Sequence, residues 1–180
     1  MTPMPAMTPS MLPGGEAATF DEPLAMLSAC HGRIRKQLAT LSRLERHLPE
    51  HGHDDDARSA ARAILRYFDT AGMHHHEDEE SSVLPRLVAR VPEARALAER
   101  LLSEHRELAA RWRKVRPLLS GIVAGKRSAL PPKLVRDLAA AYHAHIELEE
   151  SEFIPLAQEA LPADEMAAIG REMAGRRGVA

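Results

Sequence analysis

The sequence predicts an all-α protein that folds as an up-down-up-down four-helix bundle with a short C-terminal helix. Apolar residues make up 44% of the 180 residues, whereas aromatic residues make up only 3%. Alanine and leucine supply most of the apolar content beside many arginines and glutamates, a composition that favours helices over strands. Apolar residues recur at helical spacing in four long stretches, and short connections between them favour antiparallel neighbours.

The first helix is expected to begin close to Thr19, which has the spacing of a capping box with Glu22, and to end near Pro49. A loop around Gly52 follows, and an aspartate is expected to cap the next helix. One histidine, His31, interrupts the apolar face of this first helix. The residues of that face are Leu24, Leu27, His31, Ile34, Leu38, Leu41 and Leu48.

The second helix is expected over residues 55–84, with a kink at Pro85. Proline removes one backbone donor and clashes with the carbonyl four residues earlier, here that of Ser81. The inward face carries His75 and Glu79 in line with apolar residues. That face consists of Ala57, Ala61, Ile64, Phe68, Ala71, His75, Glu79 and Val83.

The third helix is expected to open at Pro92 and to bend or become disordered near Pro117, before a loop over residues 120–132. His105 is the single histidine in its apolar row. That row consists of Ala98, Leu101, His105, Leu108, Trp112, Val115 and Leu119.

The fourth helix is expected over residues 132–159, and Pro155 repeats the kink of the second helix. A last short helix is expected over residues 164–173. The inward face of the fourth helix again carries a histidine and a glutamate. That face consists of Leu134, Leu138, Ala141, His145, Glu149, Glu152 and Leu156.

The domain organisation that follows is a disordered leader over residues 1–18, one bundle domain over residues 19–160, and a C-terminal helix and tail over residues 161–180. A net charge of −2 with both signs interspersed predicts neither nucleic-acid nor membrane binding. No apolar run is long enough to span a bilayer. The single cysteine, Cys30, excludes an internal disulfide and favours a reducing cytoplasm. The oligomeric state is left open.

An internal repeat relates the second and fourth helices. Residues 75–85 align with residues 145–155, and six of the eleven aligned positions are identical. Each copy contains a His-x-x-x-Glu pair, and residues four apart are neighbours on one helix surface. Each copy can therefore grip one ion from both side chains, or use its glutamate to bridge two ions.

The histidines and glutamates of the apolar rows predict a buried metal centre. Burying a carboxylate without a partner is very costly, and no lysine or arginine shares these rows at the same level. A pair of metal ions supplies the missing charge, and mixed imidazole and carboxylate ligands suit iron, although manganese and zinc stay open. A lone buried histidine is more often a hydrogen-bonded core residue, but here the pattern repeats. The predicted ligands are His31, His75, Glu79, His105, His145 and Glu149.

Several neighbouring residues are open to more than one interpretation. His76 is either a seventh ligand or a supporting or surface residue, and the second interpretation is favoured. Tyr142 either packs or hydrogen-bonds near the metal, with packing favoured. His143 lies off the inward face, so its pairing with Glu147 is interpreted as coincidental. The acidic run 77–80 is expected to face solvent apart from Glu79.

The order of these motifs resembles the hemerythrin-like (HHE cation-binding) family over about residues 20–160. The resemblance rests on His31, the segment 75–85, His105 and the segment 145–155. It implies a four-helix bundle with two iron ions in an oxo- or hydroxo-bridged di-iron centre. Members of the family bind O₂, sense oxygen or iron, repair iron–sulfur centres after nitrosative damage, or decompose peroxide.

One departure from the family pattern bears on function. In the family that this sequence resembles, the O₂-carrying hemerythrins have the motif His-x-x-x-His on the third helix and His-x-x-x-x-Asp on the fourth. Here Ala109 stands four residues after His105, and helix face and repeat symmetry favour Glu149 over Glu150 as the ligand. The missing imidazole argues against reversible O₂ carriage and for chemistry with peroxide or NO.

Three functions are therefore considered. The first is a di-iron oxidoreductase acting on H₂O₂, O₂ or NO, supplied by an electron donor. The second is a non-catalytic module that binds or senses O₂ or iron; sensors are commonly fused to an output domain, and no second domain is expected here. The third is a helical interaction module in which the histidines are structural.

Overall fold

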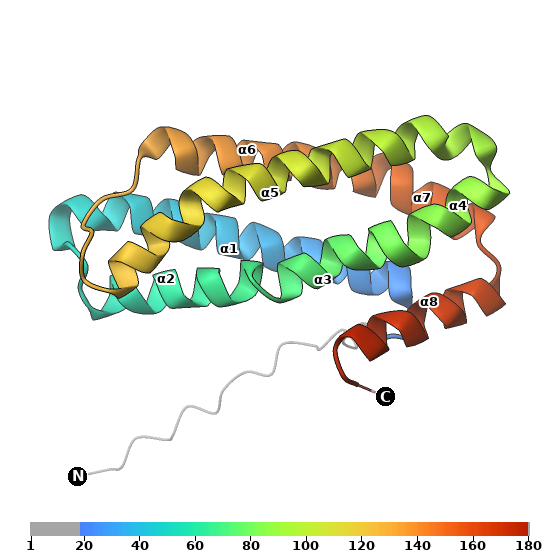
Figure 1. Ribbon diagram of the computed structural model, residues 1–180, viewed down its shortest axis with the longest axis horizontal. Helices are drawn as coiled ribbons and strands as arrows, with labels where there is room; N and C mark the ends of the chain where they lie inside the picture. The colour runs from blue at the N-terminus through green and yellow to red at the C-terminus, as the bar shows by residue number, and fades with distance from the viewer. Residues whose placement is uncertain (1–18, 180) are drawn as a thin grey trace, which may run out of the picture.

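The computed structural model describes residues 19–179, and every regular element in that range is helical (Figure 1). The prediction of an all-α bundle is thereby confirmed, whereas the leader predicted for residues 1–18 lies outside the described residues. The elements are α1 (Pro23–His51), α2 (Asp55–Phe68), α3 (Ala71–Asp78), η1 (Glu79–Val83), α4 (Leu84–Arg90), η2 (Pro92–Ala94), α5 (Arg95–Val123), α6 (Pro132–Leu148), η3 (Glu149–Phe153), α7 (Ile154–Ala160) and α8 (Ala163–Arg176).

Four long arms run up and down the bundle. They are α1, the run from α2 to α4, α5, and the run from α6 to α7 (Figure 1). The α1 helix packs on α2 and α6, and α5 packs on the same two helices, so the arms close a ring around one interior. A helix of 29 residues such as α1 spans about 43 Å. The interior is therefore long enough to hold two apolar layers with a polar layer between them.

The two apolar layers are separate clusters of buried side chains. One lies toward the α1 C-terminus and includes Leu38, Ile64 and Ile122. The other lies toward the α1 N-terminus and includes Leu27 and Phe153. The histidines that interrupt the apolar rows fall between these clusters in every arm, which surrounds any site they form with dry, closely packed side chains.

A π-helical segment lies just before each of the two prolines at which a kink was predicted. In such a segment each backbone hydrogen bond spans five residues instead of four. The Leu84 N–H donates to the carbonyl of Glu79 rather than to that of Glu80, and Ile154 does the same toward Glu149. The wider turn relieves the clash that Pro85 would otherwise make in a regular α-helix. The prolines thus place a π-helical segment, a feature that is frequent at functional sites, directly at each predicted ligand glutamate.

The π-helical segments change which residues face inward. The predicted inward positions Glu152 and Leu156 are wrong, because Glu152 is exposed and Leu156 is only partly buried. Phe153 and Ala157 are buried instead. A helical wheel assumes a constant rotation per residue, and one extra residue in the turn moves the apolar face by one position.

The predicted continuous second helix is also interrupted. The chain leaves helical geometry at Thr70, and Asp69 accepts hydrogen bonds from Trp112 Nε1 and Arg116 Nε. Gly72, rather than the predicted Ala71, takes the buried position beside Phe68. The break between α2 and α3 thus lies at Asp69 and Thr70, where Asp69 is anchored to α5.

Glycines rather than prolines set two other helix ends. The α1 helix runs through Pro49 and ends at His51, two residues beyond the proline near which its end was predicted. The α5 helix continues through Pro117 to Val123, so the loop predicted from residue 120 begins later than expected. Gly52 and Gly125 have φ values of 66° and 67°, in the left-handed region that ends helices. At the α1 start, the predicted Thr19 side-chain cap is not formed, whereas Asp54 caps α2 as predicted.

The C-terminal helix α8 is longer than predicted and lies along the outside of α3, next to α1 and η1 (Figure 1). Gly170 allows this approach, because a Cβ atom there would lie 1.9 Å from the Phe20 carbonyl oxygen. Within residues 19–179, no helix combines the length and the apolar character needed to cross a membrane.

Candidate metal centre

The structure brings all six predicted ligands into one buried cluster between the two apolar layers. All four arms contribute, because the side chains come from α1, α3 with η1, α5, and α6 with η3. Their exposed fractions are between 0% and 3%. The six residues are His31, His75, Glu79, His105, His145 and Glu149.

Glu149 lies between two pairs of histidines. Its Oε2 atom is 3.0 Å from His31 Nε2, and its Oε1 atom is 2.9 Å from His145 Nε2 and 3.6 Å from His105 Nε2. The two carboxylate oxygens thus point toward different halves of the cluster. This is the arrangement of a carboxylate that can bridge two ions.

Glu79 is placed in the same way from the opposite side. Its Oε1 atom is 3.5 Å from His75 Nε2, and its Oε2 atom is 3.3 Å from His105 Nε2. Two sets of four potential ligands result, and both contain both glutamates. One set adds His31 and His75, and the other adds His105 and His145.

The polar atoms at the centre fit a metal better than they fit one another. Within the described part of the chain, the Nε2 atoms of all four histidines and both oxygens of each glutamate are buried without a geometrically sound hydrogen bond. Buried polar atoms are nearly always paired, since leaving one unpaired costs about 1–3 kcal/mol. Close approach without alignment is what metal-ligand atoms show when they converge on a common point.

Burial disfavours the charged forms of His75 and Glu79. It lowers the pKa of His75 to about 3, so that imidazole is neutral and presents a lone pair. Burial and the neighbouring charge of Glu149 raise the pKa of Glu79. Two carboxylates so close together repel each other unless cations lie between them, which again fits metal ions.

Comparison with known proteins agrees with this geometry. Residues 22–157 match the family described as Hemerythrin HHE cation binding domain. The chain belongs to this hemerythrin HHE family. An uncharacterized protein of Haemophilus influenzae is 32% identical over 162 residues, which cover 90% of this chain and 94% of that protein. The family binds metal cations, typically iron, and the buried cluster is compatible with that role.

Three histidines of this HHE domain are held by a carboxylate on their outer nitrogen. The contacts join His31 Nδ1 to Glu150 at 3.1 Å, His105 Nδ1 to Glu80 at 2.7 Å, and His145 Nδ1 to Glu104 at 2.9 Å. A carboxylate only accepts hydrogen bonds, so each Nδ1 donates and each Nε2 is left facing the cluster. Such partners fix the ring orientation of metal-binding histidines and raise their basicity.

These carboxylates correct part of the sequence analysis. Glu80 does not simply face solvent, since it crosses to His105 on another arm. Glu150 does the same for His31, and Arg35 binds both of its oxygens and lowers its pKa. The repeat contained part of this signal, because Glu80 and Glu150 are aligned and identical. Glu104 lies on α5, outside the two copies of the repeat, so the repeat could not reveal it.

Asp78 is the second correction to the acidic run. It is fully buried, and its oxygens accept hydrogen bonds from Arg176 at 2.8 Å and from Arg177 at 2.6 Å. Arg176 also donates to Ser82 Oγ within η1. The C-terminal helix α8, which follows the matched residues 22–157, therefore contacts the π-helical segment that carries Glu79.

His76 lies inside the HHE domain, next to the metal cluster. Its ring stacks on that of His105 with 4.1 Å between centroids, and it meets the His145 ring edge-on at 5.8 Å. Burial lowers the pKa of His76 well below its ordinary value, so the ring is neutral. One ring nitrogen each of His76, His105 and His145 lie within 4.8 Å of one another.

The remaining candidates are structural or exposed. Tyr142 is buried and packs against Phe68 at 5.4 Å between ring centroids, in accordance with the packing interpretation. Cys30 is buried, and its Sγ accepts a hydrogen bond from Arg33. His143 is exposed, as predicted from its position off the inward face.

A small cavity reaches the cluster from the surface. It lies between α5 and α6, has a volume of about 180 Å³, and includes Glu104 and His145 among its lining residues. A space of this size suits diatomic molecules, peroxide and water. His145 is the one member of the six-residue cluster that lines the cavity.

Proposed function

We propose that this chain is a di-iron protein that reacts with hydrogen peroxide, O₂ or NO. In this proposal His31 and His75 hold one iron, His105 and His145 hold the other, and Glu79 and Glu149 bridge them. The observation that carries the proposal is that both glutamates belong to both sets of ligands. Bound iron would supply the one-electron chemistry, for which an electron donor is required when the reaction is not a disproportionation.

The surrounding residues support this chemistry in three ways. The Nδ1 carboxylates hold the imidazole rings in place while the charge at the centre changes. The two apolar layers exclude bulk water. The cavity beside His145 has a volume of about 180 Å³, which is sufficient for small reactants such as peroxide. The single buried cysteine suits a reducing cytoplasm.

The test is O₂ evolution or NO consumption by iron-loaded, tag-free protein. His75→Ala is expected to abolish the reaction because it removes a buried ligand. His143→Ala is the matched control, since His143 also stands four residues before a glutamate but is exposed. Iron-loaded wild-type protein that is inert to peroxide and NO would contradict the enzymatic proposal.

The second candidate is a non-catalytic O₂-binding or iron-binding module. The near-complete burial of the six ligand candidates favours this second candidate, because an enclosed site loses its bound metal slowly. A stable, reversible oxygen-bound spectrum with slow autoxidation would support this candidate over the first. Bound zinc would contradict both iron-based candidates. Unchanged thermal stability on chelation would leave only a structural role for the histidines.

A further inference from the structure

His76 is a polar residue near the cluster that the six-ligand arrangement does not use. Its Nε2 atom is buried without a hydrogen-bonding partner in the described part of the chain. The atom therefore carries the same unpaired character as the Nε2 atoms of the predicted ligands. Buried polar atoms are nearly always paired. Among the same described residues His74 Nδ1 is unpaired as well, so the position of His76 beside His105 and His145 is the deciding observation.

The position of His76 on α3 directs its ring to the half of the cluster that contains His105 and His145. Consecutive residues on a helix point about 100° apart, so His75 and His76 cannot face the same point. His75 lies against His31, with 5.0 Å between ring centroids, whereas His76 stacks on His105. Two adjacent residues of one helix thus reach the two different halves of the site.

We infer that His76 is a metal ligand, which adds a third imidazole to the ion held by His105 and His145. The inference rests on the proposed pair of ions. It makes the two ions unequal, since the ion at His31 and His75 has two imidazoles. The partnerless nitrogen and the cluster of His76, His105 and His145 are the observations that support it.

The repeat shows that this third imidazole belongs to one copy only. Ile146 aligns with His76 and is fully buried in the apolar layer. Position 109, four residues after His105, cannot take over the role, because Ala109 lies at the surface. The α5 helix supplies only one imidazole, that of His105, to its half of the site. His76 therefore brings an additional imidazole to that half from α3.

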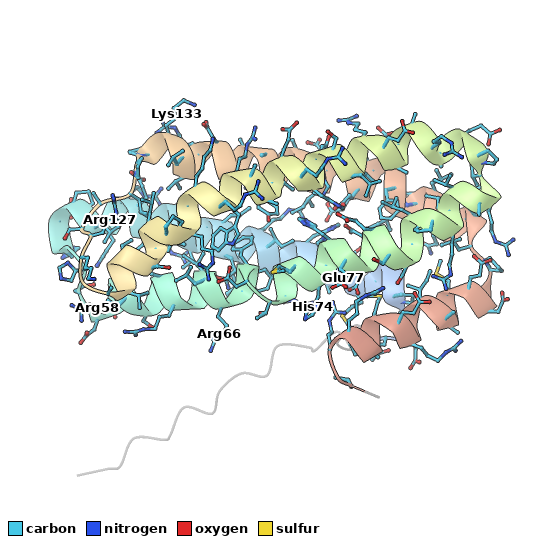
Figure 2. All side chains as sticks on the ribbon, in the orientation of Figure 1. Arg58, Arg66, His74, Glu77, Arg127 and Lys133 are labelled. Atoms are coloured by element: carbon cyan, nitrogen blue, oxygen red, sulfur yellow. The ribbon has the colours of Figure 1, made fainter. Side chains whose placement is uncertain are left out.

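The experiment compares wild-type protein, His76→Ala and His76→Gln after loading with ⁵⁷Fe. Gln keeps most of the side-chain volume, so it separates loss of the ligand from loss of packing. His74→Ala is the control, because His74 projects from the outer edge of α3, on the side where α8 lies (Figure 2). Helix content by circular dichroism confirms that each variant folds, and iron per chain and Mössbauer spectra are measured.

Wild-type protein and the control are expected to hold two irons with two distinct quadrupole doublets. Both substitutions at position 76 are expected to merge the doublets or to release one iron at least about tenfold more readily, as loss of a metal-binding contact does. Wild-type spectra and iron retention that survive both substitutions would overturn the inference while leaving the di-iron proposal intact. Wild-type protein that holds no iron pair would overturn both.

Discussion

The two copies of the repeat, residues 75–85 and 145–155, build the same backbone by different means. Both place a glutamate at the start of a π-helical segment and a proline just after it. The second copy is anchored by buried apolar residues, Ile146 and Leu148. The first has His76 and Asp78 at the aligned positions, and Asp78 is bound by Arg176 at the end of α8 and by Arg177 directly after it.

This difference separates the features that both copies share from the residues that anchor each copy to its own neighbours. The histidine, the glutamate and the π-helical turn occur in both copies, so they belong to the metal cluster. The anchoring differs because each copy meets a different neighbour on its outer side. The first copy lies against α8, and its anchoring depends on charges that come from far along the sequence.

The largest effect is expected from removing a carboxylate that is proposed to bridge the two ions. Glu149 contacts three histidines, with distances of 2.9 and 3.0 Å to His145 and His31. Glu79 contacts two, at 3.3 and 3.5 Å. Glu149→Ala should therefore lose both ions, whereas Glu79→Ala should retain part of the metal, as measured by elemental analysis. Equal metal content in the two variants would mean that the copies contribute equally.

A smaller effect is expected when the first copy is given the residue of the second at position 78. Asp78→Leu removes the buried carboxylate from Arg176 and Arg177. Hydrogen bonds to charged groups contribute about 1.5–3 kcal/mol, so the free energy of unfolding should fall by about 2 kcal/mol in urea titrations.

Asp137→Ala is the control for that experiment. Asp137 forms an exposed ion pair with Lys133, and such pairs contribute about 0–1 kcal/mol. If Asp78→Leu were as stable as this control, the hydrogen bonds of Asp78 with Arg176 and Arg177 would contribute little to stability.

The contact of α8 with the start of the bundle gives a matched pair of glycine substitutions. Gly170→Ala places a Cβ atom against the Phe20 carbonyl oxygen and should cost about 1–2 kcal/mol through forced separation. Gly175→Ala meets nothing within 4 Å and should be neutral or stabilising by up to about 1 kcal/mol, because alanine favours helices. Thermal unfolding of both variants checks this; a stable Gly170→Ala variant would refute close packing of α8.

The smallest effect is expected at the exposed end of the same helix. Arg90 pairs with Glu165 at 2.8 Å, but the arginine is largely solvated. Arg90→Ala should leave the free energy of unfolding close to that of the wild-type protein, because exposed ion pairs contribute little to stability. A larger loss would show that α8 is held by its surface ion pairs rather than by Asp78.

The fold and the six central residues could be predicted because each arm obeys one local rule. An apolar row at helical spacing fixes the inward face, and a histidine in that row must then face the interior. His31, His75, His105 and His145 were found in this way, and the repeat added Glu79 and Glu149. All six lie in the cluster, although their role as metal ligands stays a prediction.

The misplaced residues fail for two physical reasons. A helical wheel with constant rotation does not represent a π-helical turn, so Phe153 was missed in favour of Glu152. Pairing between distant segments leaves no periodic trace, so Asp78 with Arg176 was not predicted. Glu80 and Glu150 are identical in the two copies, but so are the exposed Glu77 and Glu147, so the repeat alone did not show which pair reaches the histidines.

The most direct test of the account is the metal content of tag-free protein, measured by elemental analysis beside its absorption spectrum. The account predicts two irons per chain and near-ultraviolet bands of an oxygen-bridged pair. It also predicts a lower melting temperature after chelation, since a ligand specific to the native state stabilises it. Zinc in place of iron, or little metal with no loss of stability on chelation, would contradict the di-iron centre.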